Sequence, residues 1–187
     1  MLTNVYEEDG NRTVGIYTLD TENLLLKNFT ELEDLTYGFY LENNNGELVI
    51  YGNSNEDEKD LTVYSIDLNT GKKTLRVKSE NKAMWVSKVL NIDKQKIILN
   101  NFSIITMSDN FENLKVAYAN NRTLIDFEYD VVNKEFYLLS GDPEENTFEV
   151  VILDESFLEL KKYKLEFEDT IPKDILLNYE ANTKGEK

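Results

Sequence analysis

The sequence predicts an all-β fold built from a repeated unit, on three observations. Short runs rich in Val, Ile, Tyr, Phe and Leu alternate with turns rich in Asn, Asp and Gly along all 187 residues. One segment recurs four times along the chain. The composition, 41% hydrophobic and 30% charged, is typical of a globular protein with a buried core.

The recurring segment is a short strand that ends in Asp and is followed by a turn and a second strand. The four Asp residues follow one another at intervals of 47, 42 and 45 positions. An Asp side chain readily accepts hydrogen bonds from the backbone of its own turn, so we expect these four to cap turns and not to catalyse a reaction. The copies span residues 14–20, 61–67, 103–109 and 148–154 and end in Asp20, Asp67, Asp109 and Asp154.

Two further strands are predicted upstream of each of the last three copies. They span residues 37–42 with 47–51, 84–90 with 96–99, and 124–129 with 135–139. Four strands in roughly 45 residues is the period of a β-propeller blade. We therefore predict a single β-propeller domain over residues 1–187, with units at about 1–35 plus 174–187, 36–79, 83–120 and 123–168.

The first unit lacks its first strand, and a matching strand is predicted at the other end of the chain. Residues 175–187 resemble residues 38–47, a strand followed by an Asn- and Gly-containing turn. Pairing the C-terminal strand with the N-terminal unit would close a ring of four blades and cover two open sheet edges. Three alternatives stay open: a segment of a larger propeller, two chains that form one eight-bladed ring, and a β-sandwich or barrel.

One hairpin, residues 63–73, resembles the outer hairpin of bacterial propeller repeats of the TolB and quinoprotein kind. The other three hairpins resemble it more loosely. The sequence has no Trp-Asp ending, no Gly-His start and no kelch double glycine. The resemblance therefore implies architecture and carries over no functional residue.

Charge and missing residue types exclude several functions. Twenty Lys and Arg against 36 Asp and Glu give a net charge of -16, which repels nucleic-acid phosphates. The absence of His and Cys excludes a Ser-His-Asp triad, a Cys nucleophile and zinc sites built from imidazole or thiolate. No apolar run approaches the ~18 residues of a membrane helix. We expect no nucleic acid, membrane, cofactor or metal as a ligand.

The compartment depends on the start of the chain. Residues 1–8 have neither the basic nor the apolar region of a signal peptide. The protein is cytoplasmic if Met1 is the native start and extracytoplasmic if a signal was removed, and the lack of Cys fits either place. Of the oligomeric states we favour a monomer, with the two-chain ring as the alternative.

Acidic side chains gather on the loops that a propeller places on one face. A surface of one charge sign attracts a basic partner. We therefore predict a non-enzymatic binding or scaffold module that presents this acidic loop face to a cationic protein. Its candidate residues are Glu7, Glu8, Asp9, Glu56, Asp57, Glu58, Asp142, Glu144 and Glu145.

A second candidate site lies on the first strand of each unit, which lines the central channel of a propeller. Aromatic rings beside carboxylates suit a sugar site, and two carboxylates are the minimum for glycoside hydrolysis. The alternative function is therefore a carboxylate-dependent glycan-acting enzyme or a sugar-binding propeller. We expect Trp85, the single tryptophan, to be buried between blades. The channel candidates are Tyr40, Trp85, Asp126, Glu128 and Tyr179.

Overall fold

The computed structural model describes residues 2–6, 12–23, 25–44, 46–54, 60–79, 85–142, 144–166 and 171–177. These residues form fifteen strands in four antiparallel sheets, and in each sheet the strands follow one another in sequence order. The described ranges contain no helix, so none is long and apolar enough to cross a membrane. The predicted all-β fold is confirmed.

The first sheet has three strands and the other three have four. The first sheet holds β1 (Leu2–Tyr6), β2 (Arg12–Asp20) and β3 (Leu25–Leu32). The second holds β4 (Leu35–Asn44), β5 (Glu47–Ser54), β6 (Leu61–Asp67) and β7 (Lys73–Ser79). The third holds β8 (Lys88–Ile92), β9 (Gln95–Leu99), β10 (Ser103–Ser108) and β11 (Lys115–Ala119). The fourth holds β12 (Thr123–Asp130), β13 (Glu135–Asp142), β14 (Thr147–Asp154) and β15 (Glu159–Leu165).

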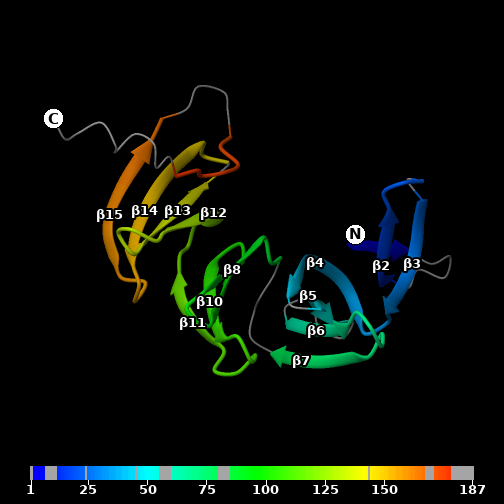
Figure 1. Cartoon of the computed structure of the whole chain (residues 1–187). Coiled ribbons are helices and arrows are strands. Elements are labelled where there is room, and N and C mark those ends of the chain that lie inside the picture. Colours follow the sequence, from blue (N-terminus) through cyan, green and yellow to red (C-terminus); the bar gives the residue numbers. More distant parts are fainter. Residues whose placement is uncertain are drawn as a thin grey trace.

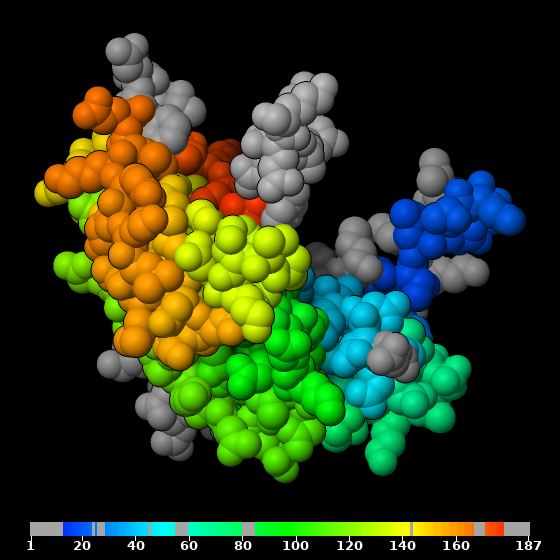
Figure 2. Space-filling model, turned by 60° about the vertical axis from the view of Figure 1, so that its left-hand side comes forward, coloured from blue at the N-terminus to red at the C-terminus, as the bar shows by residue number. Residues whose placement is uncertain are grey.

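The four sheets stand side by side in an arc, like blades (Figure 1). The first strand of each four-stranded sheet, β4, β8 or β12, faces the middle of the arc, and β7, β11 and β15 lie on its outside. The N-terminal and C-terminal sheets lie at opposite ends, with the second and third sheets between them (Figures 1 and 2). This is the arrangement of propeller blades.

An apolar core fills each of the three junctions between consecutive sheets. Ile16 of β2 meets Ile66 of β6 in the first core, Val63 of β6 meets Ile105 of β10 in the second, and Ile104 of β10 meets Leu153 of β14 in the third. Burying each such side chain contributes about 1.5 to 3 kcal/mol. Strand β6 is buried from Leu61 to Ile66 because successive side chains enter two different cores.

Three of the four repeated Asp residues cap their turns as predicted. The carboxylate of Asp20 accepts the backbone N–H of Glu22 at 3.0 Å, Asp67 accepts that of Thr70 at 2.7 Å, and Asp154 accepts that of Ser156 at 2.8 Å. At the third copy the prediction is wrong: Ser108 Oγ, one residue before Asp109, accepts the N–H of Glu112 at 3.0 Å. A hydroxyl one position earlier performs the same capping.

The predicted closing strand needs a correction. Only residues 175–177 of the predicted 175–187 lie in the described part of the chain, and they form no strand. The backbone N–H of Ile175 donates to Asp126 Oδ2 of β12 at 3.0 Å, so this acceptor holds the segment on the fourth sheet. Strand β1 pairs with β2 in a three-stranded sheet. Tyr179 and the other residues beyond 177 lie outside the described residues.

A buried ion pair joins the second and third sheets. Lys96 of β9 is fully buried, and its Nζ lies 2.6 Å from Glu42 Oε1 of β4. Asn91 Oδ1 accepts a second hydrogen bond from this ammonium at 3.0 Å, and the hydroxyl of Tyr51 donates to Glu42 Oε2 at 3.0 Å. Both charges therefore keep polar partners after losing water.

Lys96→Met should lower the free energy of unfolding by roughly 3 to 5 kcal/mol, because the substitution leaves the carboxylate of Glu42 buried without its cation. Adding Glu42→Gln should recover part of this loss. Urea denaturation measures both. The control is Lys134→Met, which removes an exposed pair with Glu155 and should cost less than about 1 kcal/mol. Equal losses for the two lysines would contradict the structural role of the buried pair.

Candidate functional site on the inner strands

The predicted acidic loop face is described only in part. Glu7, Glu8, Asp9, Glu56, Asp57 and Glu58 lie outside the described residues. Asp142 follows β13, and its Oδ1 accepts the backbone N–H groups of Glu144 at 3.0 Å and Glu145 at 3.2 Å. This carboxylate caps its own turn, whereas the side chains of Glu144 and Glu145 are exposed.

Tyr40 packs between sheets instead of lining the channel. Its ring meets that of Tyr51 edge to face, with centroids 6.0 Å apart and planes at 68°. Both rings belong to the core that joins the second and third sheets. The pairing of β4 with β5 has two bulges, one of them between Gly38 and Tyr40. At a bulge the side chains no longer alternate strictly between the two faces of the sheet.

Trp85 is 62% exposed, so the prediction that it is buried between blades is wrong. Strand β8 begins only at Lys88, and Trp85 precedes it with a φ of 62°. This left-handed conformation is costly for a bulky side chain. Trp85 is therefore not part of an extended strand, in which alternate side chains would point into a core.

Trp85 ends a row of three stacked rings. Its ring lies 6.3 Å from that of Phe39 with planes at 21°, and Phe39 lies 6.0 Å from Tyr37 with planes at 14°. Tyr37 and Phe39 come from β4, so the row crosses from the second sheet to the segment that enters the third. We call Tyr37, Phe39 and Trp85 the aromatic row.

A group of three charged side chains joins the first strands of the third and fourth sheets. Lys88 Nζ of β8 lies 3.1 Å from Asp126 Oδ1 and 2.5 Å from Glu128 Oε1, both of β12. Burial lowers the pKa of Lys88, but the hydrogen bonds to Glu128 and Asp126 outweigh it and raise the pKa above its usual value. The ammonium therefore stays charged beside its carboxylates.

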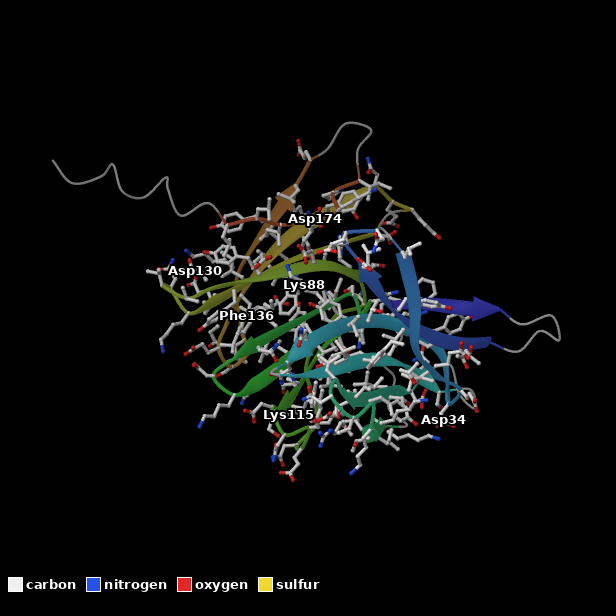
Figure 3. The ribbon with its side chains drawn as sticks, turned by 45° about the vertical axis from the view of Figure 1, so that its right-hand side comes forward. Asp34, Lys88, Lys115, Asp130, Phe136 and Asp174 are labelled. Atoms are coloured by element: carbon white, nitrogen blue, oxygen red, sulfur yellow. The ribbon has the colours of Figure 1, made fainter. Side chains whose placement is uncertain are left out.

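The segment 171–177 lies against this group. The N–H of Ile175 binds the second carboxylate oxygen of Asp126, whose first oxygen binds Lys88. Lys88 and Asp174, which is the residue before Ile175, are both labelled in Figure 3. We call the aromatic row together with Lys88, Asp126 and Glu128 the inner-strand site.

The two carboxylates of this group lie on the same strand. Asp126 and Glu128 lie two positions apart on one strand and share one ammonium. Glycoside hydrolysis needs two carboxyl groups that face each other across the substrate. Among the described residues, no group of three acidic side chains could hold a metal ion.

The sequence pointed to Trp85, Asp126 and Glu128 but missed Lys88 and Phe39. Lys88 is 38 residues away from Asp126, and only the packing of the third sheet against the fourth brings them together. Phe39 could have been found from the sequence. It lies two positions after Tyr37 on a strand predicted to line the channel, so the two side chains are expected on the same face.

Because Trp85 is the single tryptophan, its fluorescence reports on this site alone. We expect red-shifted emission that acrylamide quenches readily, since 62% of the side chain faces solvent. Trp85→Ala should lower the free energy of unfolding by less than about 1 kcal/mol, far below the roughly 3 to 5 kcal/mol of a buried tryptophan. Blue-shifted, poorly quenched emission would contradict the exposed position.

No protein-family model matches the sequence, and no curated protein matches it. Solved structures do resemble its fold. They include a chain of a nidogen/laminin complex, with a TM-score of 0.57 and 11% identity over 92% of this chain and 64% of that chain. Oligogalacturonate lyase in complex with manganese has a TM-score of 0.54 and 11% identity, over 86% and 52% of the two chains. The calcium-binding protein regucalcin from Agrobacterium tumefaciens has a TM-score of 0.51 and 13% identity, over 88% of this chain and 60% of that chain.

The chain thus spans between 52% and 64% of the length of these three structures. They are β-propeller-type folds and include an enzyme, the lyase. At 13% identity or less the likeness concerns the fold alone. With the four sheets of this chain, it shows a β-propeller architecture.

Proposed function

We propose that this protein is a non-enzymatic binding module that recognises a cationic partner through its inner-strand site. The observation that carries the proposal is Trp85, a large aromatic side chain that is exposed and at the same time held in place by stacking on Phe39. The protein accepts a costly backbone conformation at this residue, and such strain gathers at binding sites.

An exposed, stacked indole favours cations. The face of a tryptophan ring attracts an ammonium or guanidinium group within about 6 Å, and the attraction contributes about 0.5 to 2 kcal/mol. Stacking on Phe39 limits the freedom of the ring before a ligand arrives, so less entropy is lost on binding. A lysine or arginine side chain of a partner protein supplies the matching group.

The charge of the site and of the whole chain supports the same ligand class. The inner-strand site holds one ammonium, Lys88, against the carboxylates of Asp126 and Glu128. The net charge of -16 accelerates the approach of a basic partner and repels an anionic one. The acidic loop face stays part of the proposal as the source of this long-range attraction.

Two finer points belong to the proposal. The first is that the protein is not an enzyme. In support, Asp126 and Glu128 both bind the ammonium of Lys88, so neither carboxylate is free to act as a general acid or a nucleophile. A relation to blades of the TolB kind is supported only by the hairpin of residues 63–73. A neutral glycan is the competing ligand, because sugars also stack on aromatic rings.

An oligolysine peptide should change the emission of Trp85 in a saturable way, and its affinity should fall as salt rises because the attraction is screened within about 10 Å at 0.1 M. Trp85→Ala should weaken binding about tenfold in calorimetry, which is about 1.4 kcal/mol. The matched control is Phe102→Ala, an exposed aromatic residue outside the site, which should bind like the wild type.

Two results would contradict the proposal. Equal binding by Trp85→Ala and the wild type would remove the inner-strand site from recognition. A neutral oligosaccharide that shifts Trp85 emission independently of salt, when oligolysine leaves it unchanged, would replace the cationic partner with a glycan.

A further inference from the structure

The repeat allows one position to be compared in all four sheets. On the outermost strand of each sheet, one residue pairs with the residue four positions before the cap of the turn, which is Asp20, Asp67, Ser108 or Asp154. The four residues in this position are Thr30, Val77, Tyr118 and Tyr163.

In the first three sheets the side chain at this position, or the bulge residue next to it, makes a contact at the junction with the next sheet. Phe29 of β3 packs on the core shared by the first and second sheets. The guanidinium carbon of Arg76 lies 5.5 Å from the ring centroid of Phe111, which follows β10 in the third sheet. The hydroxyl of Tyr118 donates to Glu159 Oε1 of the fourth sheet at 2.7 Å.

Tyr163, the fourth member, lies on β15 at the end of the arc and is 51% exposed. On the same strand Leu160 is also exposed. The C-terminal sheet therefore presents the side chain that joins blades elsewhere in this chain, without a following sheet in the described residues.

The first sheet carries the complementary half of the same junction. The residue just before the turn Asp is Ile66 in the second sheet and Leu153 in the fourth, and both are 0% exposed in the core shared with the preceding sheet. The corresponding residue of the first sheet, Leu19, is 51% exposed. In the third sheet Ser108 holds this position and its neighbour Met107 is buried instead.

We propose that the fourth sheet of one copy packs on the first sheet of a second copy, with Tyr163 and Leu19 in the interface. The two ends of the arc lie apart within one copy (Figures 1 and 2). A second copy offers the matching half, since the contact repeats a junction that the chain forms three times within itself.

The charges of the fourth sheet and of the first sheet are also complementary. Strand β15 reads Glu-Leu-Lys-Lys-Tyr-Lys-Leu, so it is basic in a chain of net charge -16. The first sheet carries Glu22 in its β2–β3 turn, Glu31 on β3 and Glu33 after it. Attraction between Lys161, which is on the same side of β15 as Tyr163, and these carboxylates offsets part of the repulsion between two acidic copies.

This contact is head to tail, because it uses different surfaces on the two copies. Such contacts close into a ring when the rotation fits and otherwise continue into a filament. Two arcs of four sheets would give eight sheets, which lies within the usual range for β-propellers. We therefore assign a closed ring of two chains.

Light scattering on the purified chain should give twice the 21.8 kDa mass of one copy. Leu19→Glu and Tyr163→Glu should each give a monomer with an unchanged circular dichroism spectrum, because each damages both junctions of the ring. A mixture of the two variants should form a heterodimer, since one junction then joins two undamaged surfaces. The control Val116→Glu, at an exposed apolar residue of β11, should stay dimeric.

A wild type that stays monomeric at every concentration overturns this inference. If in that case Leu19→Glu and Tyr163→Glu both lower the melting temperature well beyond the control, the two end sheets pack on each other within one chain. Filaments in place of a discrete dimer would also overturn the closed ring. None of these results depends on whether oligolysine binds the inner-strand site.

Discussion

The burial of apolar side chains between consecutive sheets is the constraint on which the rest of this structure depends. A four-stranded sheet has two faces, and at each of the three junctions in the described residues a face is kept from water by the adjoining sheet. Strand β6 shows the result, because Val63 enters the core toward the third sheet and Ile66 enters the core toward the first. The arc is therefore held together by a series of similar junctions.

One polar pair lies buried at a junction with its two members on adjoining sheets. Glu42 on the second sheet and Lys96 on the third are both buried, and each is the charged partner of the other. An apolar pair of similar volume would often be as stable, but a misaligned charged pair would leave two unpaired buried ions. The pair thus fixes how the second sheet sits on the third.

Much of the fold could be predicted from the sequence, because the repeat combines period-two strands with a turn Asp in every unit. The same reasoning failed where one residue departs from the repeat. Ser108 takes over the capping from Asp109, and the positive φ of Trp85 delays the start of β8 and leaves the indole in solvent. Lys88 was missed because its partnership with Asp126 arises only from sheets packing together.

The burial of side chains between sheets also explains why the inner-strand site lies on the inner strands. A middle strand such as β9 has hydrogen-bonded neighbours on both sides and is buried from Lys96 to Leu99, so its side chains are committed to the cores. An inner strand such as β12 has a neighbour on one side only, and Asp126 and Glu128 point away from the core that holds Phe127. Charged and aromatic side chains can gather on such an edge without disturbing the junctions. The aromatic row, which spans two sheets, also depends on the junction between them, so the position of Trp85 is set by the packing of the second sheet on the third.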